Sequence, residues 1–256
     1  MKRLLKNILI LLFVLGVSGC STSPAGRTQL KLMPESQMDA MGAESFSKMK
    51  QTMPRVTSGP DVRWVTCITH TLLDVMGENK NEWEIQIFKD SSPNAFALPG
   101  KKMGVHTGMI SLVSNSSELA AVIGHEIAHV KAGHGNERVS QQLIIQSGLS
   151  VAQIALGNGK ETDNMILAGL GLGAQFGILL PFSRSHEKEA DILGLKYMGQ
   201  AGYDPMGAVS LWQKMAAQGG SPPEFLSTHP SSQSRIQYLS ERAQGMPRPE
   251  QTPCPR

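Results

Sequence analysis

The sequence lacks a surplus of charge of either sign. Its 24 basic residues are matched by 21 acidic ones, and three of the basic residues, Lys2, Arg3 and Lys6, lie in a leader segment. Subtracting these three from 24 leaves 21 basic and 21 acidic residues, so the rest of the chain is formally neutral. Proteins that bind nucleic acid usually carry a basic patch. The charge balance therefore argues against nucleic acid as a partner.

Repeats and a serine-nucleophile motif are also missing. No internal repeat is evident, and 256 residues with 40% hydrophobic content can bury one sizeable core. We therefore predict a single folded domain. No GxSxG element occurs, although a lipid-modifying or esterase-type hydrolase with a serine nucleophile would need one.

The first hydrophobic run is short. A basic start precedes an uncharged stretch from Ile8 to Val17, which is too short to span a bilayer stably and is typical of an export signal. The following Val17-Ser18-Gly19-Cys20 resembles the lipobox of bacterial lipoproteins, whose cysteine becomes the lipidated first residue. An ordinary cleaved signal is the alternative. Ser21 resembles the outer-membrane sorting pattern, so we expect a lipid anchor at Cys20 on the periplasmic side of the outer membrane.

The chain divides into four predicted segments: a signal peptide at 1–19, a tether at 20–34, a domain at 35–245 and a loose, proline-rich tail at 246–256. Cysteine is scarce, since only Cys67 and Cys254 remain beside Cys20. In an oxidising envelope these two cysteines form either a disulfide that ties the tail to the domain or two unrelated thiols. The sequence leaves both alternatives open.

The pattern of apolar residues predicts an α+β fold that is mainly helical, with a small sheet just before the central helix. Ser117 is the expected N-cap of that central helix. Helices are predicted as two within 35–76, one from 117 to about 133, one at about 184–199 and one after 205, and strands at 83–88, 95–98 and 103–107. The uncharged stretch 165–182 contains four glycines and is predicted as a buried or groove-lining helix, with a membrane span as the alternative.

The central helix carries His125-Glu126-Ile127-Ala128-His129, which has the HExxH form. Residues four apart share one face of a helix, so both imidazoles can reach a single Zn²⁺, while Glu126 points to the water that zinc polarises. Glu126 then takes a proton from that water as the water attacks a peptide carbonyl. The apolar flanks make unliganded histidines costly. A surface helix with two solvated histidines is the alternative.

A catalytic zinc usually takes a third protein ligand. Glu187 and Asp191 lie four residues apart on the predicted helix 184–199, so one can bind zinc while the other accepts a hydrogen bond from a ligand imidazole. We assign Glu187 as the ligand and Asp191 as the acceptor. Glu189 lies nearly opposite and is predicted to be a solvated charge. His134 does not have the spacing of the metzincin third ligand and is not assigned.

The stretch 124–129, followed by Glu187-Lys188-Glu189-Ala190-Asp191, resembles the gluzincin metallopeptidase family that includes HtpX, the CAAX prenyl proteases, OMA and BepA. The match covers residues 35–243 and implies a zincin-like metalloprotease domain. Asn94-Ala95-Phe96-Ala97 resembles the family's edge-strand motif, which implies that Ala95 and Phe96 pair with bound substrate and that Asn94 faces the site. Thr228-His229-Pro230 and Arg235 resemble the late motif, which implies that His229 and Arg235 lie near the oxyanion or the metal. Whether His229 is a fourth zinc ligand or a transition-state donor stays open.

These features predict a zinc-dependent endopeptidase of the bacterial envelope that acts in protein quality control on unfolded or misassembled proteins. The alternative is a chaperone or outer-membrane assembly factor that uses the same groove. Glu126 favours the enzyme, because a structural zinc site needs no general base. We also expect residues 165–177, with the polar turn 157–160, to cover the groove beside Asn94 and restrain activity; a plain core helix is the alternative.

Overall fold

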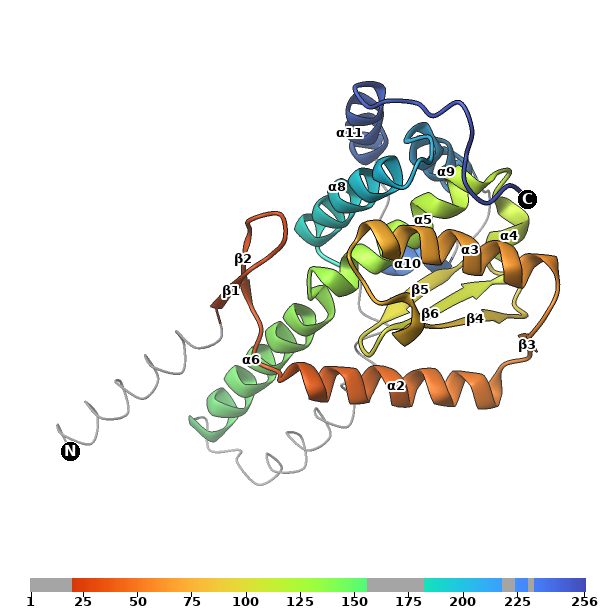
Figure 1. Cartoon of the computed structure of the whole chain (residues 1–256). Helices are drawn as coiled ribbons and strands as arrows, with labels where there is room; N and C mark the ends of the chain where they lie inside the picture. Colours follow the sequence, from red (N-terminus) through yellow and green to blue (C-terminus); the bar gives the residue numbers. More distant parts are fainter. Residues whose placement is uncertain (1–19, 156–181, 218–223, 230–232) are drawn as a thin grey trace.

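The computed structural model describes residues 20–155, 182–217, 224–229 and 233–256. It confirms a mainly helical α+β domain with a small sheet (Figure 1). The predicted covering segment at 157–177 lies outside the described residues, as does most of the stretch 165–182. Within the described ranges, no helix combines the length and the hydrophobicity that crossing a membrane requires.

The main sheet has four strands in the order β3-β4-β6-β5. Strands β4 and β6 are parallel and the other neighbours are antiparallel, so β5 forms one edge. The strands are β3 (Arg55–Val56), β4 (Glu84–Phe88), β5 (Ala95–Leu98) and β6 (Lys102–His106). The predicted strands therefore exist, and the sheet also gains the short β3.

Helices cover both faces of this sheet. Helix α2 (Glu35–Thr52) lies along one face, where Phe46 packs against Phe88 and Leu98 (Figure 1). Gly42 of α2 approaches Pro99 so closely that an added Cβ would lie 2.1 Å from the Pro99 carbonyl oxygen. Helix α3 (Pro60–Val75) lies on the other face and belongs to the larger core. The sheet edge at β5 is thus bordered by a closely packed helix.

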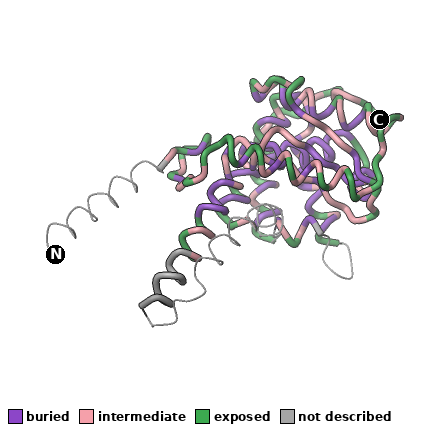
Figure 2. The backbone as a smooth tube through the Cα atoms, turned by 90° about the horizontal axis from the view of Figure 1, so that it is seen from below, coloured by how far each residue is buried: buried purple, intermediate pink, exposed green. Residues whose placement is uncertain are grey.

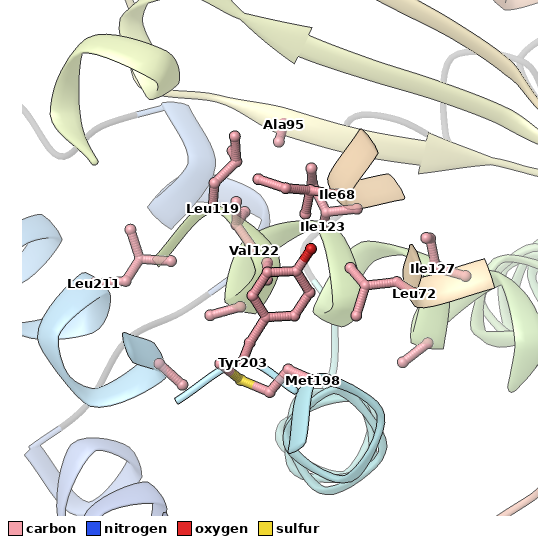
Figure 3. Packing of buried hydrophobic residues seen from close by; sticks show 14 of the residues in the cluster. Ile68, Leu72, Ala95, Leu119, Val122, Ile123, Ile127, Met198, Tyr203 and Leu211 are labelled. Atoms are coloured by element: carbon pink, nitrogen blue, oxygen red, sulfur yellow. The ribbon is translucent and has the colours of Figure 1, made fainter. Parts of the chain in front are cut away.

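Helix α5 (Ser116–Lys131) runs through the middle of the domain, and every residue from Ser116 to His129 is buried. Its apolar side chains pack with Ile68 and Leu72 of α3 on one side and with Met198 and Tyr203 on the other (Figure 3). Asn115, rather than the expected Ser117, caps the helix, because its side-chain oxygen accepts the Glu118 amide at 3.0 Å.

The remaining helices surround α5. They are α4 (Thr107–Leu112), α6 (His134–Ala155), α8 (Arg184–Gln200), α9 (Met206–Ala217), α10 (Glu224–Thr228) and α11 (Gln233–Gln244), with a 3-10 turn η1 at Lys80–Glu82. Buried residues run through these helices and through the first turns of α6 (Figure 2). Helices α5 and α8 cross closely at a point where each has a glycine. A Cβ added to Gly194 of α8 would lie 3.1 Å from the backbone nitrogen of His125 in α5. This close crossing brings the predicted zinc ligand of α8 next to the two predicted ligands of α5.

The two segments that flank the predicted domain 35–245 both contact it. The expected tether contains a two-stranded hairpin, β1 (Cys20–Thr22) and β2 (Thr28–Leu30), with a buried Gln29. The expected loose tail is joined to α3 by a disulfide between Cys67 and Cys254. Each segment has specific partners on the domain that are far away in sequence. The disulfide is one of the two alternatives that the sequence left open.

Candidate metal centre

Four buried side chains converge from three parts of the chain. His125 and His129 come from α5, Glu187 from α8 and His229 from the end of α10. One potential ligand atom from each lies within 4.8 Å of the others. The structure thus brings together the three predicted ligands, and it adds His229 to the same group.

The spacing of these atoms fits a tetrahedral zinc ion. Bonds of about 2.0–2.1 Å give a tetrahedron whose edges measure roughly 3.3–3.4 Å. The two Nε2 atoms of His125 and His129 are 3.0 Å apart, and His129 Nε2 lies 3.4 Å from Glu187 Oε1. His229 Nδ1 lies 3.3 Å from His125 Nε2 and 2.9 Å from Glu187 Oε1. The donor set of imidazoles and one carboxylate is also typical of zinc.

Asp191 orients His125. The carboxylate Oδ1 lies 3.0 Å from His125 Nδ1, so this nitrogen donates its proton to Asp191 and Nε2 is the atom that faces the cluster. Burial opposes a charge on His125, but Asp191 and Glu187 outweigh it and raise the pKa of His125 to about 9. The site therefore favours a positive charge at this position, which a metal ion would supply.

Arg235 holds two of the three carboxylates of α8. Its Nε donates to Asp191 Oδ2 at 2.6 Å, and its Nη1 forms an ion pair with Glu187. The guanidinium lies 3.6 Å from the ring centre of Trp212. Arg235 therefore contacts the carboxylates of the ligand cluster, one of the two positions that the resemblance implied.

A second chain of contacts orients His129. His129 Nδ1 lies 2.9 Å from His134 Nδ1, and His134 Nε2 lies 3.2 Å from Glu189 Oε2. Burial is the main cause that lowers the pKa of His134 to about 4, so His134 is neutral. Its Nε2–H donates to Glu189 and its Nδ1 accepts the proton of His129 Nδ1. His129 Nε2 is then free to bind a metal.

The prediction that Glu189 is a solvated charge was wrong. Its side chain is 4% exposed and contacts His134 and Arg27. Sequence reasoning missed both Glu189 and His134 as supporting residues. Helical spacing correctly separated Glu189 from Glu187 and Asp191, but the pattern contained no signal that a distant segment would cover the opposite face of α8.

Glu126 faces the same cluster without belonging to it. Its Oε2 lies 3.4 Å from the Ala97 amide, and its Oε1 lies 3.4 Å from His229 Nε2. Among the described residues, no hydrogen-bond donor satisfies the buried Oε1. Burial raises the pKa of Glu126, which strengthens it as a base.

A cleft of about 520 Å³ opens beside these residues. Asn94, as the resemblance implied, lines this cleft together with Glu126, His129 and His229. The opposite wall is α2 with its methionines. The catalytic candidates and strand β5 thus line the same cleft.

Strand β5 offers backbone groups to this cleft. The Asn94 carbonyl accepts a hydrogen bond from the His106 amide at 2.9 Å. In an antiparallel pair every second residue is hydrogen-bonded to the partner strand, so the backbone groups of Phe96, two residues further on, also face β6. Ala95 and Ala97 direct theirs outward, and the Ala97 amide points to Glu126. The residues suited to backbone pairing with a substrate are therefore Ala95 and Ala97, whereas Phe96 packs its ring over Gly104.

Two histidines in an HExxH helix, a glutamate from a second helix and a further carboxylate that lines the cleft define the arrangement of the HExxH metallopeptidases. Comparison with known proteins agrees with this class. The chain belongs to peptidase family M48, whose model matches residues 61–243.

Individual relatives point the same way. The chain is 37% identical over 185 residues to the mitochondrial metalloendopeptidase OMA1 of Schizosaccharomyces pombe, which covers 71% of this chain and 53% of that protein. It is 29% identical over 214 residues to the beta-barrel assembly-enhancing protease of Yersinia pestis, covering 81% and 44%. Human OMA1 is 28% identical over 229 residues, covering 84% and 44%. The chain spans about half the length of the curated relatives it matches.

Proposed function

We propose that this protein is a zinc-dependent metalloendopeptidase of the bacterial envelope that cleaves unfolded or misassembled envelope proteins. The observation that carries the proposal is the position of Glu126, which is buried beside the four metal-ligand candidates and faces a cleft bordered by the edge strand β5. Membership of peptidase family M48 supports the reaction class. The export signal and Cys20 support the envelope location.

The residues divide the work of peptide hydrolysis. Zinc held by His125, His129 and Glu187 would supply the Lewis acidity that activates water and polarises the substrate carbonyl. Glu126 accepts the proton of the attacking water and returns it to the leaving amine. Strand β5 holds the substrate in an extended form through the outward backbone groups of Ala95 and Ala97. Only a chain with unpaired backbone groups can add to this edge, so unfolded proteins are the preferred substrates.

The second candidate is a chaperone or outer-membrane assembly factor that binds chains in the same cleft. The cleft and the open edge of β5 serve binding as well as cleavage. That reading gives no role to a buried carboxylate next to the metal-ligand candidates. The two functions therefore differ in what they predict for Glu126.

The test compares Glu126→Gln with Glu44→Gln, a matched change at an exposed position of α2. Casein digestion by the purified proteins and their zinc content are measured together. Glu126→Gln keeps zinc but loses digestion, because an amide cannot accept and return the proton, whereas Glu44→Gln keeps both. Full digestion by Glu126→Gln would contradict the enzyme assignment, and absence of zinc from the wild type would contradict the metal assignment.

The anchor needs its own test. In cells, Cys20→Ser should move the protein from the membrane fraction to the soluble periplasmic fraction and abolish labelling with a fatty acid. An unchanged distribution, with no label on the wild type, would contradict lipidation at Cys20.

A further inference from the structure

The N-terminal hairpin contacts the domain next to the metal centre. Arg27, in the turn between β1 and β2, places Nε 2.9 Å from Glu189 Oε2. Its two terminal nitrogens bind both oxygens of Glu137 at 2.8 and 2.6 Å. Gln29 adds a hydrogen bond to the Ala132 carbonyl. The hairpin is thus attached to α6 and α8 through polar contacts.

Arg27 is the permanent positive charge at this interface. Glu137 and Glu189 are buried, with side chains 8% and 4% exposed, and each would be unfavourable there without a charged partner. Each carboxylate also contacts one histidine, His186 at 3.0 Å from Glu137 and His134 at 3.2 Å from Glu189, whereas Arg27 contacts both carboxylates. Both carboxylates therefore depend on Arg27.

The same carboxylate leads to the metal. Glu189 Oε2 accepts hydrogen bonds from Arg27 and from His134, and His134 in turn contacts His129 Nδ1. Arg27 fixes the position of Glu189, Glu189 fixes the tautomer of His134, and His134 fixes the ring of His129 with Nε2 toward the cluster. Hydrogen-bond partners behind metal ligands typically change affinity by 10–100-fold.

We propose that the hairpin is a working part of the metal centre, in which Arg27 is a positioning residue for His129 through Glu189 and His134. The inference rests on the proposed zinc site. It adds a segment that lies outside residues 61–243, the part matched by the family model. Arg27 itself does not line the cleft, so a substitution at Arg27 would loosen one zinc ligand without changing a residue of the cleft wall.

Gln29 provides a matched control on the same hairpin. It is buried and binds the domain through Ala132 and Glu137, but it has no contact with Glu189 or His134 in the described part of the chain. Loss of general docking affects Arg27 and Gln29 variants alike. Loss of the positioning contact affects only the Arg27 variant.

The experiment measures the zinc dissociation constant of the full chain by competition with a chelator, alongside thermal unfolding and peptide cleavage. Arg27→Gln should weaken zinc binding about 10-fold or more and lower kcat, with KM little changed. Gln29→Ala should stay within about twofold of the wild type. Arg27→Lys should recover part of the affinity, since lysine keeps the charge but cannot bind both carboxylates in a fork.

Equal zinc affinity in Arg27→Gln and the wild type would overturn the inference, and so would equal weakening in Arg27→Gln and Gln29→Ala. If Arg27→Gln does not fold, Glu189→Gln serves instead. Its zinc affinity should also fall about 10-fold, and an unchanged value would overturn the inference. Failure of the wild type to bind zinc would instead overturn the proposed function.

Discussion

The two ends of the described chain are held to the domain by different kinds of bond. The hairpin and the C-terminal tail lie on opposite sides of the molecule (Figure 1). The hairpin uses charged hydrogen bonds from Arg27 to Glu137 and Glu189. The tail uses the disulfide between Cys67 and Cys254. The disulfide does not depend on ionised groups, although Arg256 of the tail adds an exposed ion pair with Asp61 at 3.6 Å.

The two attachments also differ in what lies behind them. The Cys254 carbonyl accepts hydrogen bonds from Trp64 Nε1 at 3.0 Å and from Ser116 Oγ at 2.6 Å. Ser116 is the first residue of α5, nine residues before His125, which is about 14 Å along a helix. In contrast, Arg27 of the hairpin is linked to His129 through only two intervening residues, Glu189 and His134. The tail should therefore affect stability alone, and the hairpin should affect both stability and metal binding.

The largest expected effect comes from removing the disulfide. Cys67→Ser combined with Cys254→Ser opens a covalent loop whose ends are 187 residues apart, and the free energy of unfolding should fall by about 2–5 kcal/mol. Denaturant unfolding of the purified protein measures this loss. Zinc affinity at a temperature well below unfolding should not change, and a weakened zinc site would break the contrast between the two ends.

Removing a carboxylate from the hairpin interface comes next. Glu137→Ala leaves Arg27 without its two-oxygen partner, and the free energy of unfolding should fall by about 1–3 kcal/mol. Hydrogen–deuterium exchange should become faster at residues 20–33 and stay unchanged at residues 246–256. Glu44→Ala, at an exposed position, is the control and should alter neither segment.

A smaller effect is expected for a single hydrogen bond of the tail. Ser116→Ala removes the hydroxyl that donates to the Cys254 carbonyl, and the free energy of unfolding should fall by about 1 kcal/mol. The measurement is thermal unfolding with the disulfide intact. Exchange at residues 20–33 should not respond, and a faster rate there would show that the two ends are coupled.

The smallest effect concerns pH. Burial opposes ionisation of Glu137, but hydrogen bonds from Arg27 and the neighbouring His186 outweigh it and lower the pKa of Glu137 below 4.5. A carboxylate with a lowered pKa in the folded state contributes stability above its unfolded pKa, and this stability is lost as pH falls through the folded value. The stability difference between wild type and Glu137→Gln should therefore shrink below about pH 4.5. A difference that grows on acidification would contradict the assigned ion pair.

The sequence predicted the metal-ligand candidates better than the residues that hold them in place. His125, His129, Glu187 and Asp191 were found because residues four apart share a helix face, which is a local rule. The contacts of Arg27 with Glu137 and Glu189 span 110 and 162 residues, and no periodicity along the chain indicates them. The disulfide stayed undecided for the same reason, since spacing does not determine pairing.

Two of the wrong predictions concerned single residues, the N-cap of α5 and the substrate-pairing residue of β5. The N-cap was placed two residues late because Ser117 and Asn115 are both good capping residues, and only the geometry shows which oxygen reaches the Glu118 amide. Phe96 was named for substrate pairing because the motif includes it. The alternation of hydrogen bonds along β5, which depends on the register with β6, gives that role to Ala95 and Ala97.

If Cys20 carries the proposed lipid, the hairpin also limits how far the domain can extend from the membrane. A flexible tether of 15 residues would let the domain reach about 50 Å from its lipid. Cys20 is instead paired with Leu30 inside the hairpin, so almost none of that length is slack. The proposed lipid anchor would then keep the catalytic domain close to the bilayer surface. The domain would mainly encounter protein chains that lie at the membrane.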